Sequence, residues 1–187
     1  MALRGPGWEW VAEQLVPSNV MAEIERCAVR VVLQDAAGSL LMFEAIDPAG
    51  DAVGTWWELP GGGVEVGEDV VATALREIAE ETGLALAPEQ VGAPTWRRSV
   101  TYLRRGRRVL QHEVVVAVEL TERAPTLVRE GQTNEELEDY LGHRWWPLPE
   151  LFAAVEQGLW TYPGRLGQLL PRFLAGQQLA EPFERWN

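Results

Sequence analysis

A run of glycines leading directly into an acid-rich amphipathic helix is the feature that most constrains how this chain can fold. Residues 60–63, Pro-Gly-Gly-Gly, break regular structure. From about Asp69 to Thr82 the apolar spacing predicts a helix, and either Asp69 or Glu68 is placed to cap its first turn. Gly83 is expected to end that helix in the left-handed conformation that other residues resist.

Short apolar segments on both sides of this helix predict the strands of a mixed α/β domain. Residues 26–34 and 39–46 indicate a hairpin whose turn is formed by residues 35–38. Further strands are expected at 56–59, 91–102, 107–120 and 144–146, and further helices at 149–157 and 165–174. A short helix around residues 10–15, a long acidic loop at 121–142 and a loose tail complete the expected order.

The formal net charge of −12 argues against a general nucleic-acid-binding role, because an acidic surface repels a polyphosphate backbone. The charge does not argue against small nucleotides as ligands, since bound divalent cations reverse the charge locally. The single cysteine, Cys27, lies in an apolar run and is expected to be a core residue rather than a reactive thiol. No stretch reaches the roughly 18 apolar residues of a membrane span, so we expect a cytoplasmic protein with no membrane partner.

Three glutamates share one face of the central helix. At roughly 100° per residue, Glu77, Glu80 and Glu81 occupy positions i, i+3 and i+4, whereas apolar residues line another face. Like charges at this spacing repel one another, and a hard divalent cation such as Mg²⁺ would turn the repulsion into coordination. The three glutamates alone also allow a solvated acidic face.

The glycines ahead of the helix favour the metal-binding interpretation. Gly61, Gly62 and Gly63 let the backbone approach the acidic face closely and reach positive φ. A backbone carbonyl there could serve as one more oxygen ligand for a hard cation. If residues 60–63 were only a loop that connects a strand to a helix, they would not need to lie at a particular distance from the glutamates.

The whole segment resembles the Nudix box, Gly-x5-Glu-x7-Arg-Glu-U-x-Glu-Glu-x-Gly-U, in which U is a bulky apolar residue. The nine fixed positions are all matched, by Gly62, Glu68, Arg76, Glu77, Ile78, Glu80, Glu81, Gly83 and Leu84. The flanking segments 57–62 and 145–151 are also similar to the family. The resemblance is expected to cover residues 24–157 as a Nudix hydrolase domain, with residues 1–23 as an N-terminal extension and residues 158–187 as a C-terminal helix and tail.

This resemblance implies an α/β/α sandwich with a mixed sheet, in which the box helix comes between strands and holds Mg²⁺ or Mn²⁺. By position, Glu77, Glu80 and Glu81 would bind the metal, and the Gly61 carbonyl would be a further ligand. Gly62, Glu68 and Arg76 would have structural roles that orient this cluster. The metal would position a water molecule, lower its pKa and stabilise charge on the leaving phosphate.

The general base is expected to be Glu80 from the box or a carboxylate from a later loop. In this family the base or an extra ligand can come from such a loop, and Glu136 is the first candidate there, alongside Glu135 and Glu138. Glu113 on the preceding strand is a further candidate. Each loop residue would also fit a solvated acidic surface.

Six of the 16 basic residues gather between residues 97 and 108. Such a cluster could guide a phosphate tail toward the metals, or it could be the solvated tip of a hairpin. Arg98 and Tyr102 are named as substrate-binding candidates, Tyr102 because a base could stack there and because a tyrosine follows the box in some Nudix enzymes that act on dinucleoside polyphosphates. Aromatic residues on strands are also common in cores.

Two functions from different classes fit these residues. The first is Mg²⁺-dependent hydrolysis of a phosphoanhydride bond in a small nucleotide, or in a nucleoside diphosphate linked to another group. The second is a non-catalytic Nudix-like sensor of such a nucleotide, a role that often goes with erosion of the box glutamates. The isopentenyl diphosphate isomerase branch uses a cysteine, and the place of Cys27 upstream in a strand argues against it. Since Nudix enzymes are commonly dimers, a homodimer acting on a small nucleotide, with no nucleic-acid polymer, is expected.

Overall fold

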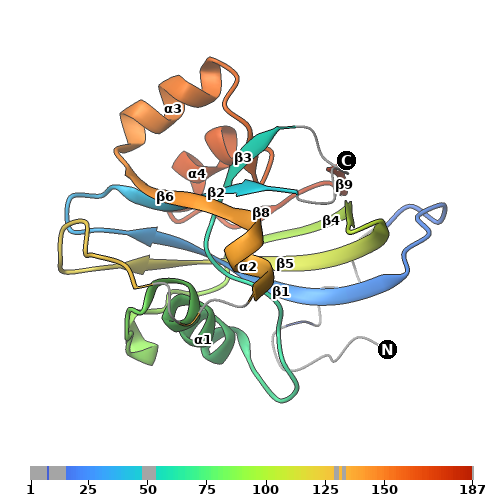
Figure 1. Ribbon diagram of the computed structural model, residues 1–187, viewed down its shortest axis with the longest axis horizontal. Coiled ribbons are helices and arrows are strands. Elements are labelled where there is room, and N and C mark those ends of the chain that lie inside the picture. Colours follow the sequence, from blue (N-terminus) through green and yellow to red (C-terminus); the bar gives the residue numbers. More distant parts are fainter. Residues whose placement is uncertain (1–7, 9–15, 48–53, 129–130, 132–133, 187) are drawn as a thin grey trace.

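The computed structural model describes residues 8, 16–47, 54–128, 131 and 134–186, which form one mixed β-sheet with helices on both faces (Figure 1). The strands are β1 (Ile24–Gln34), β2 (Leu40–Ile46), β3 (Thr55–Glu58), β4 (Trp96–Arg104), β5 (Arg107–Glu119), β6 (Tyr140–Trp146), β7 (Thr161–Tyr162), β8 (Leu179–Ala180) and β9 (Glu184–Arg185). The helices are α1 (Val70–Thr82), α2 (Asn134–Asp139), α3 (Leu148–Glu156) and α4 (Leu166–Leu174), with a short 3₁₀ turn at Pro88–Gln90.

The strand order is β7-β3-β2-β1-β5-β4-β8, with β6 paired to β2 and β9 paired to β4. Strand β1 runs parallel to β5 over its whole length, whereas β4 and β5 form an antiparallel hairpin. Strands β1 and β2 form the expected hairpin, which begins at the Gln34–Leu40 pair. The mixed α/β fold class predicted from the sequence is confirmed.

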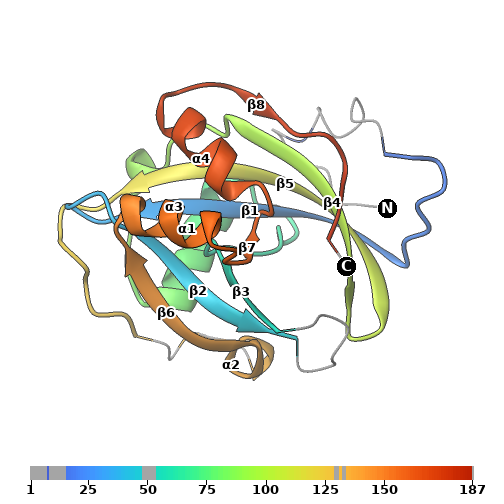
Figure 2. The same ribbon diagram turned by 90° about the horizontal axis from the view of Figure 1, so that it is seen from above.

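The core lies in two layers, one on each face of the sheet. Side chains alternate along a strand, and in β1 the buried Val29, Val31 and Leu33 belong to the apolar cluster that α1 covers. Val32, which lies between them, belongs to the cluster under α3 and α4. Figures 1 and 2 show α1 on one side of the sheet and these two helices on the other.

Helix α1 begins and ends as the sequence predicts. The Asp69 side chain accepts a hydrogen bond from the Ala72 backbone N–H at 2.8 Å, which caps the first turn. Gly83 adopts φ 72° at the C-cap, in the left-handed region that glycine tolerates.

The glycine segment is held against β1. The Val29 N–H donates to the Gly62 carbonyl and the Val31 N–H to the Pro60 carbonyl, both at 2.9 Å. Gly61 has φ 122°, and a Cβ there would lie 2.2 Å from the Val29 carbonyl oxygen, so only glycine fits. Helix α1 packs on one face of β1. The pairing of the glycine segment with β1 therefore brings the glycine carbonyls to the acidic side of α1.

Three expectations about the chain after the box helix were wrong. The expected loop at 121–142 contains helix α2 and the start of β6, whose pairing with the distant β2 decides its conformation. The expected loose tail forms β8 and β9, which are two residues long and too short for any periodicity to reveal. The strand expected from residue 91 begins at Trp96, after the 3₁₀ turn.

The helix expected near residues 10–15 lies outside the described residues. Within the described part of the chain, no helix combines the length and the apolar character needed to cross a membrane.

Candidate functional site

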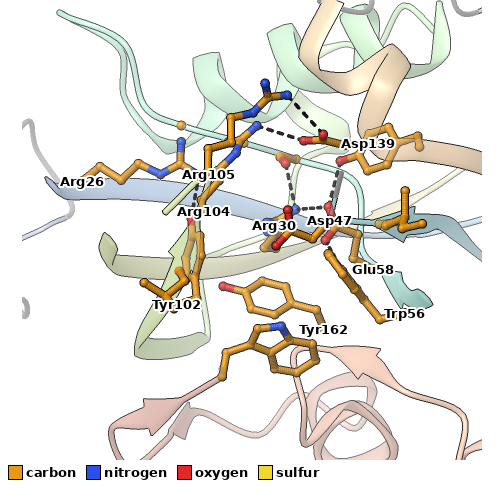
Figure 3. A pocket seen from close by; sticks show the side chains of 18 of the residues that line it. Arg26, Arg30, Asp47, Trp56, Glu58, Tyr102, Arg104, Arg105, Asp139 and Tyr162 are labelled. Atoms are coloured by element: carbon orange, nitrogen blue, oxygen red, sulfur yellow. Dashed lines mark hydrogen bonds and ion pairs between the residues drawn. The ribbon is translucent and has the colours of Figure 1, made fainter. Parts of the chain in front are cut away.

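A pocket opens where the glycine segment meets the β4–β5 hairpin, the start of β6 and Trp186, the residue after β9. The space within it that the centres of water molecules can occupy is about 190 Å³. Figure 3 shows Arg104 and Arg105 across this pocket from Trp56 and Tyr162. Glu77 from α1 and Glu58 from β3 add carboxylates to its lining.

Glu81 is the most enclosed carboxylate of the three predicted metal ligands. It is 1% exposed and accepts a hydrogen bond from the Gly61 N–H at 2.8 Å. The Tyr140 hydroxyl lies 3.1 Å from its other oxygen and 2.8 Å from an oxygen of Glu58. Burial raises the pKa of Tyr140 well above its usual value, and the charges of Glu58 and Glu81 raise it further, so this hydroxyl stays protonated and links the two carboxylates.

Glu77 is pressed against the backbone of the first box glycine. Its carboxylate atoms lie 2.6–2.7 Å from the position where a Cβ on Gly62 would be. Glu77 is itself buried, so its carboxylate has little room to move aside. Gly62 therefore provides the space in which this carboxylate reaches the pocket.

Arg76 ties the acidic face of α1 to the loop before it. It donates to Glu68 at 2.7 and 3.0 Å, to the Gly63 carbonyl at 2.7 Å, and to Glu77 and Glu80 at 2.9 Å each. The hydrogen bond from Arg76 lowers the pKa of Glu68 to about 2. Through these contacts Arg76 holds Glu68, Glu77 and Glu80 beside the glycine segment.

Arg30 places a buried positive charge under the glycine segment. Its Nη1 donates to the carbonyls of Leu59 and Gly61 at 3.0 Å each and lies 3.4 Å from Glu58. Burial alone would lower the pKa of Arg30, but Glu58 and Glu113 raise it well above its usual value. Sequence reasoning missed this role of Arg30, because no motif marks an arginine inside an apolar strand.

The residues at this site fit a hard divalent cation. Glu58, Glu77, Glu80 and Glu81 outnumber the guanidinium groups of Arg30 and Arg76 that contact them, so an excess of negative charge remains among these six groups. The donor atoms are carboxylate and carbonyl oxygens, which Mg²⁺ prefers. As the side chains stand, no three His, Cys, Asp or Glu groups converge into a closed metal site among the described residues, and Arg76 lies between Glu77 and Glu80.

Arg98 and Glu113 do not lie where the sequence analysis expected them to act. Arg98 is fully buried and forms ion pairs with Glu113, with Glu181 at 3.2 Å and with Glu184, so a substrate phosphate cannot reach it. Glu113 is equally buried, and although burial would raise its pKa, Arg98 and Arg30 lower it. We therefore correct both assignments: this pair is part of the core beneath the pocket.

Tyr102 does line the pocket, and it orients a cation that the sequence analysis missed. Its hydroxyl accepts a hydrogen bond from Arg26 at 2.9 Å and donates to Gln111 at 2.8 Å. Arg26 also donates to Gln111 and lines the pocket beside the glycines. Its hydrogen-bond partners in the described structure are neutral, which leaves its charge for an anion.

The arginines at the tip of the β4–β5 hairpin contact the segment that carries the loop glutamates. Arg104 and Arg105 pair with Asp139 at 3.3 and 3.4 Å, and Arg105 pairs with Glu138 at 3.2 Å. Glu138 is thus engaged in an exposed ion pair at the pocket mouth. The side chains of Glu135 and Glu136 lie outside the described part of the chain.

Comparison with known proteins gives a consistent family. A model of the NUDIX domain matches residues 25–166. The MutT protein of Methanosarcina mazei Go1 superposes with a TM-score of 0.54 at 18% identity, covering 84% of this chain and 98% of that one, and so shares the fold.

Two curated relatives add sequence similarity. An RNA pyrophosphohydrolase of Dinoroseobacter shibae is 40% identical over 81 residues, which are 43% of this chain and 48% of that protein. The nucleoside triphosphatase NudI of Escherichia coli is 34% identical over 116 residues, which are 60% of this chain and 75% of that protein. The alignments thus span less than half the length of the RNA pyrophosphohydrolases that match first.

Proposed function

We propose that this chain, which belongs to the Nudix hydrolase family, cuts a phosphoanhydride bond in a small nucleotide with the help of Mg²⁺ or Mn²⁺. The proposal rests on the position of the Glu77 carboxylate. Its atoms lie 2.6–2.7 Å from the point where a Cβ on Gly62 would be, and the second buried glutamate of α1 is Glu81. Buried carboxylates gathered around a glycine backbone in a pocket suit a cation that binds phosphate.

Glu77, Glu80 and Glu81 would hold the metal, with the Gly61 carbonyl as a further oxygen ligand. When bound, the metal supplies a water of lowered pKa and stabilises negative charge on the leaving phosphate. Tyr140 and the Gly61 N–H keep Glu81 in place, and Arg76 keeps Glu77 and Glu80 in place.

Glu80 is our first candidate for the general base. Its side chain is 38% exposed, compared with 6% for that of Glu77, so a water molecule can reach it. Glu136 stays the second candidate, on the resemblance to the family alone. For the substrate phosphates we propose Arg26 in place of Arg98, because Arg26 lines the pocket and has neutral partners.

We further propose that residues 24–157 form the catalytic domain, with residues 1–23 as an extension. The C-terminal segment 158–187 would then serve that domain directly. In support, β7 pairs with β3, and β8 and β9 pair with β4.

A Mg²⁺-dependent hydrolysis screen tests this function. The panel holds nucleoside di- and triphosphates, ADP-ribose, dinucleoside polyphosphates, nucleotide sugars and coenzyme A. The panel also holds RNA, because the D. shibae relative is named an RNA pyrophosphohydrolase. We expect turnover of one group of small nucleotides that EDTA abolishes. Tight nucleotide binding without turnover under Mg²⁺ or Mn²⁺ would favour the sensor instead.

Replacing Gly62 with alanine is expected to lower kcat about 10- to 100-fold and to raise the Mg²⁺ concentration needed for half-maximal rate. The new Cβ would lie within 2.7 Å of the Glu77 carboxylate and displace it. Gly142→Ala is the matched control, since nothing lies within 4 Å of a Cβ there. Equal Mg²⁺ dependence in both variants would contradict a ligand role for Glu77.

A further inference from the structure

We propose that Trp186 is a specificity-determining residue on which the nucleobase of the substrate stacks. The inference rests on the proposed action on nucleotides and names the part of the pocket that takes the base. Trp186 lines the same pocket as the glycine segment and Glu77, although it is far from them in the sequence. Its side chain is half-buried, so part of it faces the pocket.

Three aromatic side chains lie edge-to-face around the Trp186 ring. Its centroid lies 6.3 Å from that of Trp56, 5.1 Å from that of Tyr162 and 6.4 Å from that of Trp160, at interplanar angles of 72°, 90° and 64°. These are edge-to-face contacts, so none of the three rings lies parallel to the indole. A planar base entering the pocket can adopt the offset parallel stack that these neighbours do not make.

The backbone around Trp186 is anchored to the sheet. Its N–H donates to the Thr101 carbonyl at 2.9 Å, and β9 pairs in parallel with β4. Glu184, two residues earlier, forms an ion pair with the buried Arg98. Trp186 is therefore held in position before any ligand arrives, which lowers the entropic cost of binding.

The pocket lining combines groups that suit the two ends of a nucleotide. The glycines and Glu77 form the proposed metal and phosphate end, and Arg26 adds a cation beside them. Glu58 connects this end to the aromatic wall, because it accepts a hydrogen bond from Trp56 Nε1 at 2.8 Å. A ligand with a phosphate at one end and a planar ring at the other uses both kinds of lining, as a nucleotide does.

Isothermal titration of nucleoside 5′-monophosphates tests this inference. The four common ribonucleotides and ribose 5-phosphate are titrated with Mg²⁺ into the wild-type chain, Trp186→Ala, Trp186→Phe and Trp160→Ala. Trp160 belongs to the same cluster but is 55% exposed and does not line the pocket. We expect Trp186→Ala to bind at least one nucleotide about 10-fold more weakly, with Trp160→Ala unchanged and Trp186→Phe close to wild type. Ribose 5-phosphate, which has no base, should bind all four proteins alike.

Equal nucleotide affinities for Trp186→Ala and Trp160→Ala would overturn the inference. So would a wild-type chain that binds no monophosphate better than ribose 5-phosphate. Because a monophosphate contains no anhydride, the comparison gives its answer even if the hydrolysis screen fails. Conversely, the chain could hydrolyse a nucleotide while Trp186→Ala binds nucleotides as the wild type does. That result would support the proposed function and contradict only the stacking role of Trp186.

Discussion

Replacing Glu81 with glutamine is expected to reduce kcat by about 1,000-fold or more while the protein stays folded. A metal supplies several kcal/mol of stabilisation to the transition state, and each 1.36 kcal/mol lost is a factor of ten in rate. Glutamine has the same shape and can still accept the hydrogen bond from the Gly61 N–H that Glu81 accepts at 2.8 Å. It removes the negative charge that the proposed cation needs, so the loss should appear in the rate and not in the fold.

Steady-state kinetics under saturating Mg²⁺, with circular dichroism as the folding check, measures this effect. Glu89→Gln is the matched control, because Glu89 is an exposed glutamate in the 3₁₀ turn, away from the pocket lining. A rate for Glu81→Gln within a few fold of that for Glu89→Gln would remove Glu81 from the mechanism.

The second large effect is on stability. Replacing Arg98 with methionine is expected to lower the free energy of unfolding by about 3–5 kcal/mol, the usual cost of leaving buried charges without their partner. Arg98 is fully buried, and its guanidinium forms ion pairs with Glu113, Glu181 and Glu184. Burial would lower its pKa, but these carboxylates, Glu113 first, raise it, so Arg98 stays charged in the folded protein.

Urea denaturation compares Arg98→Met with Arg97→Met, the exposed neighbour on the same strand. The control should change the free energy of unfolding by less than about 0.5 kcal/mol. In Arg98→Met, hydrogen exchange should also rise at β8 and β9, because Glu181 and Glu184 hold that segment through Arg98. An equally small effect in both variants would show that the buried ion pairs contribute nothing to stability.

Local patterns were enough to predict the part of the fold around the box. The Asp69 cap, the Gly83 end and the β1–β2 hairpin each depend on a few neighbouring residues, and each is present. The predicted acidic face of α1 also lies beside the glycine segment, since backbone pairing with β1 fixes that segment there.

The rest of the site depends on contacts between distant segments, which one sequence does not reveal. Arg98 was expected to bind substrate because it lies in a cluster of six basic residues, yet carboxylates from the C-terminal segment keep it in the core. Trp186 reaches the pocket only through the two-residue strand β9. Arg26 and Arg30 each lie in an apolar strand, and only the pairing of β1 with β5 shows what surrounds them.

In the proposed reaction, carboxylates of α1 direct water to a phosphorus atom of a phosphoanhydride. The most direct test is ³¹P NMR of products formed in ¹⁸O-enriched water, with the substrate that the screen identifies. We predict two phosphate-ended products, one of which carries ¹⁸O on phosphorus, and no ¹⁸O incorporation with Glu81→Gln. Products without ¹⁸O on any phosphorus would contradict attack of water on phosphorus. Incorporation of ¹⁸O by Glu81→Gln equal to that of the wild type would contradict a role of Glu81 in that attack.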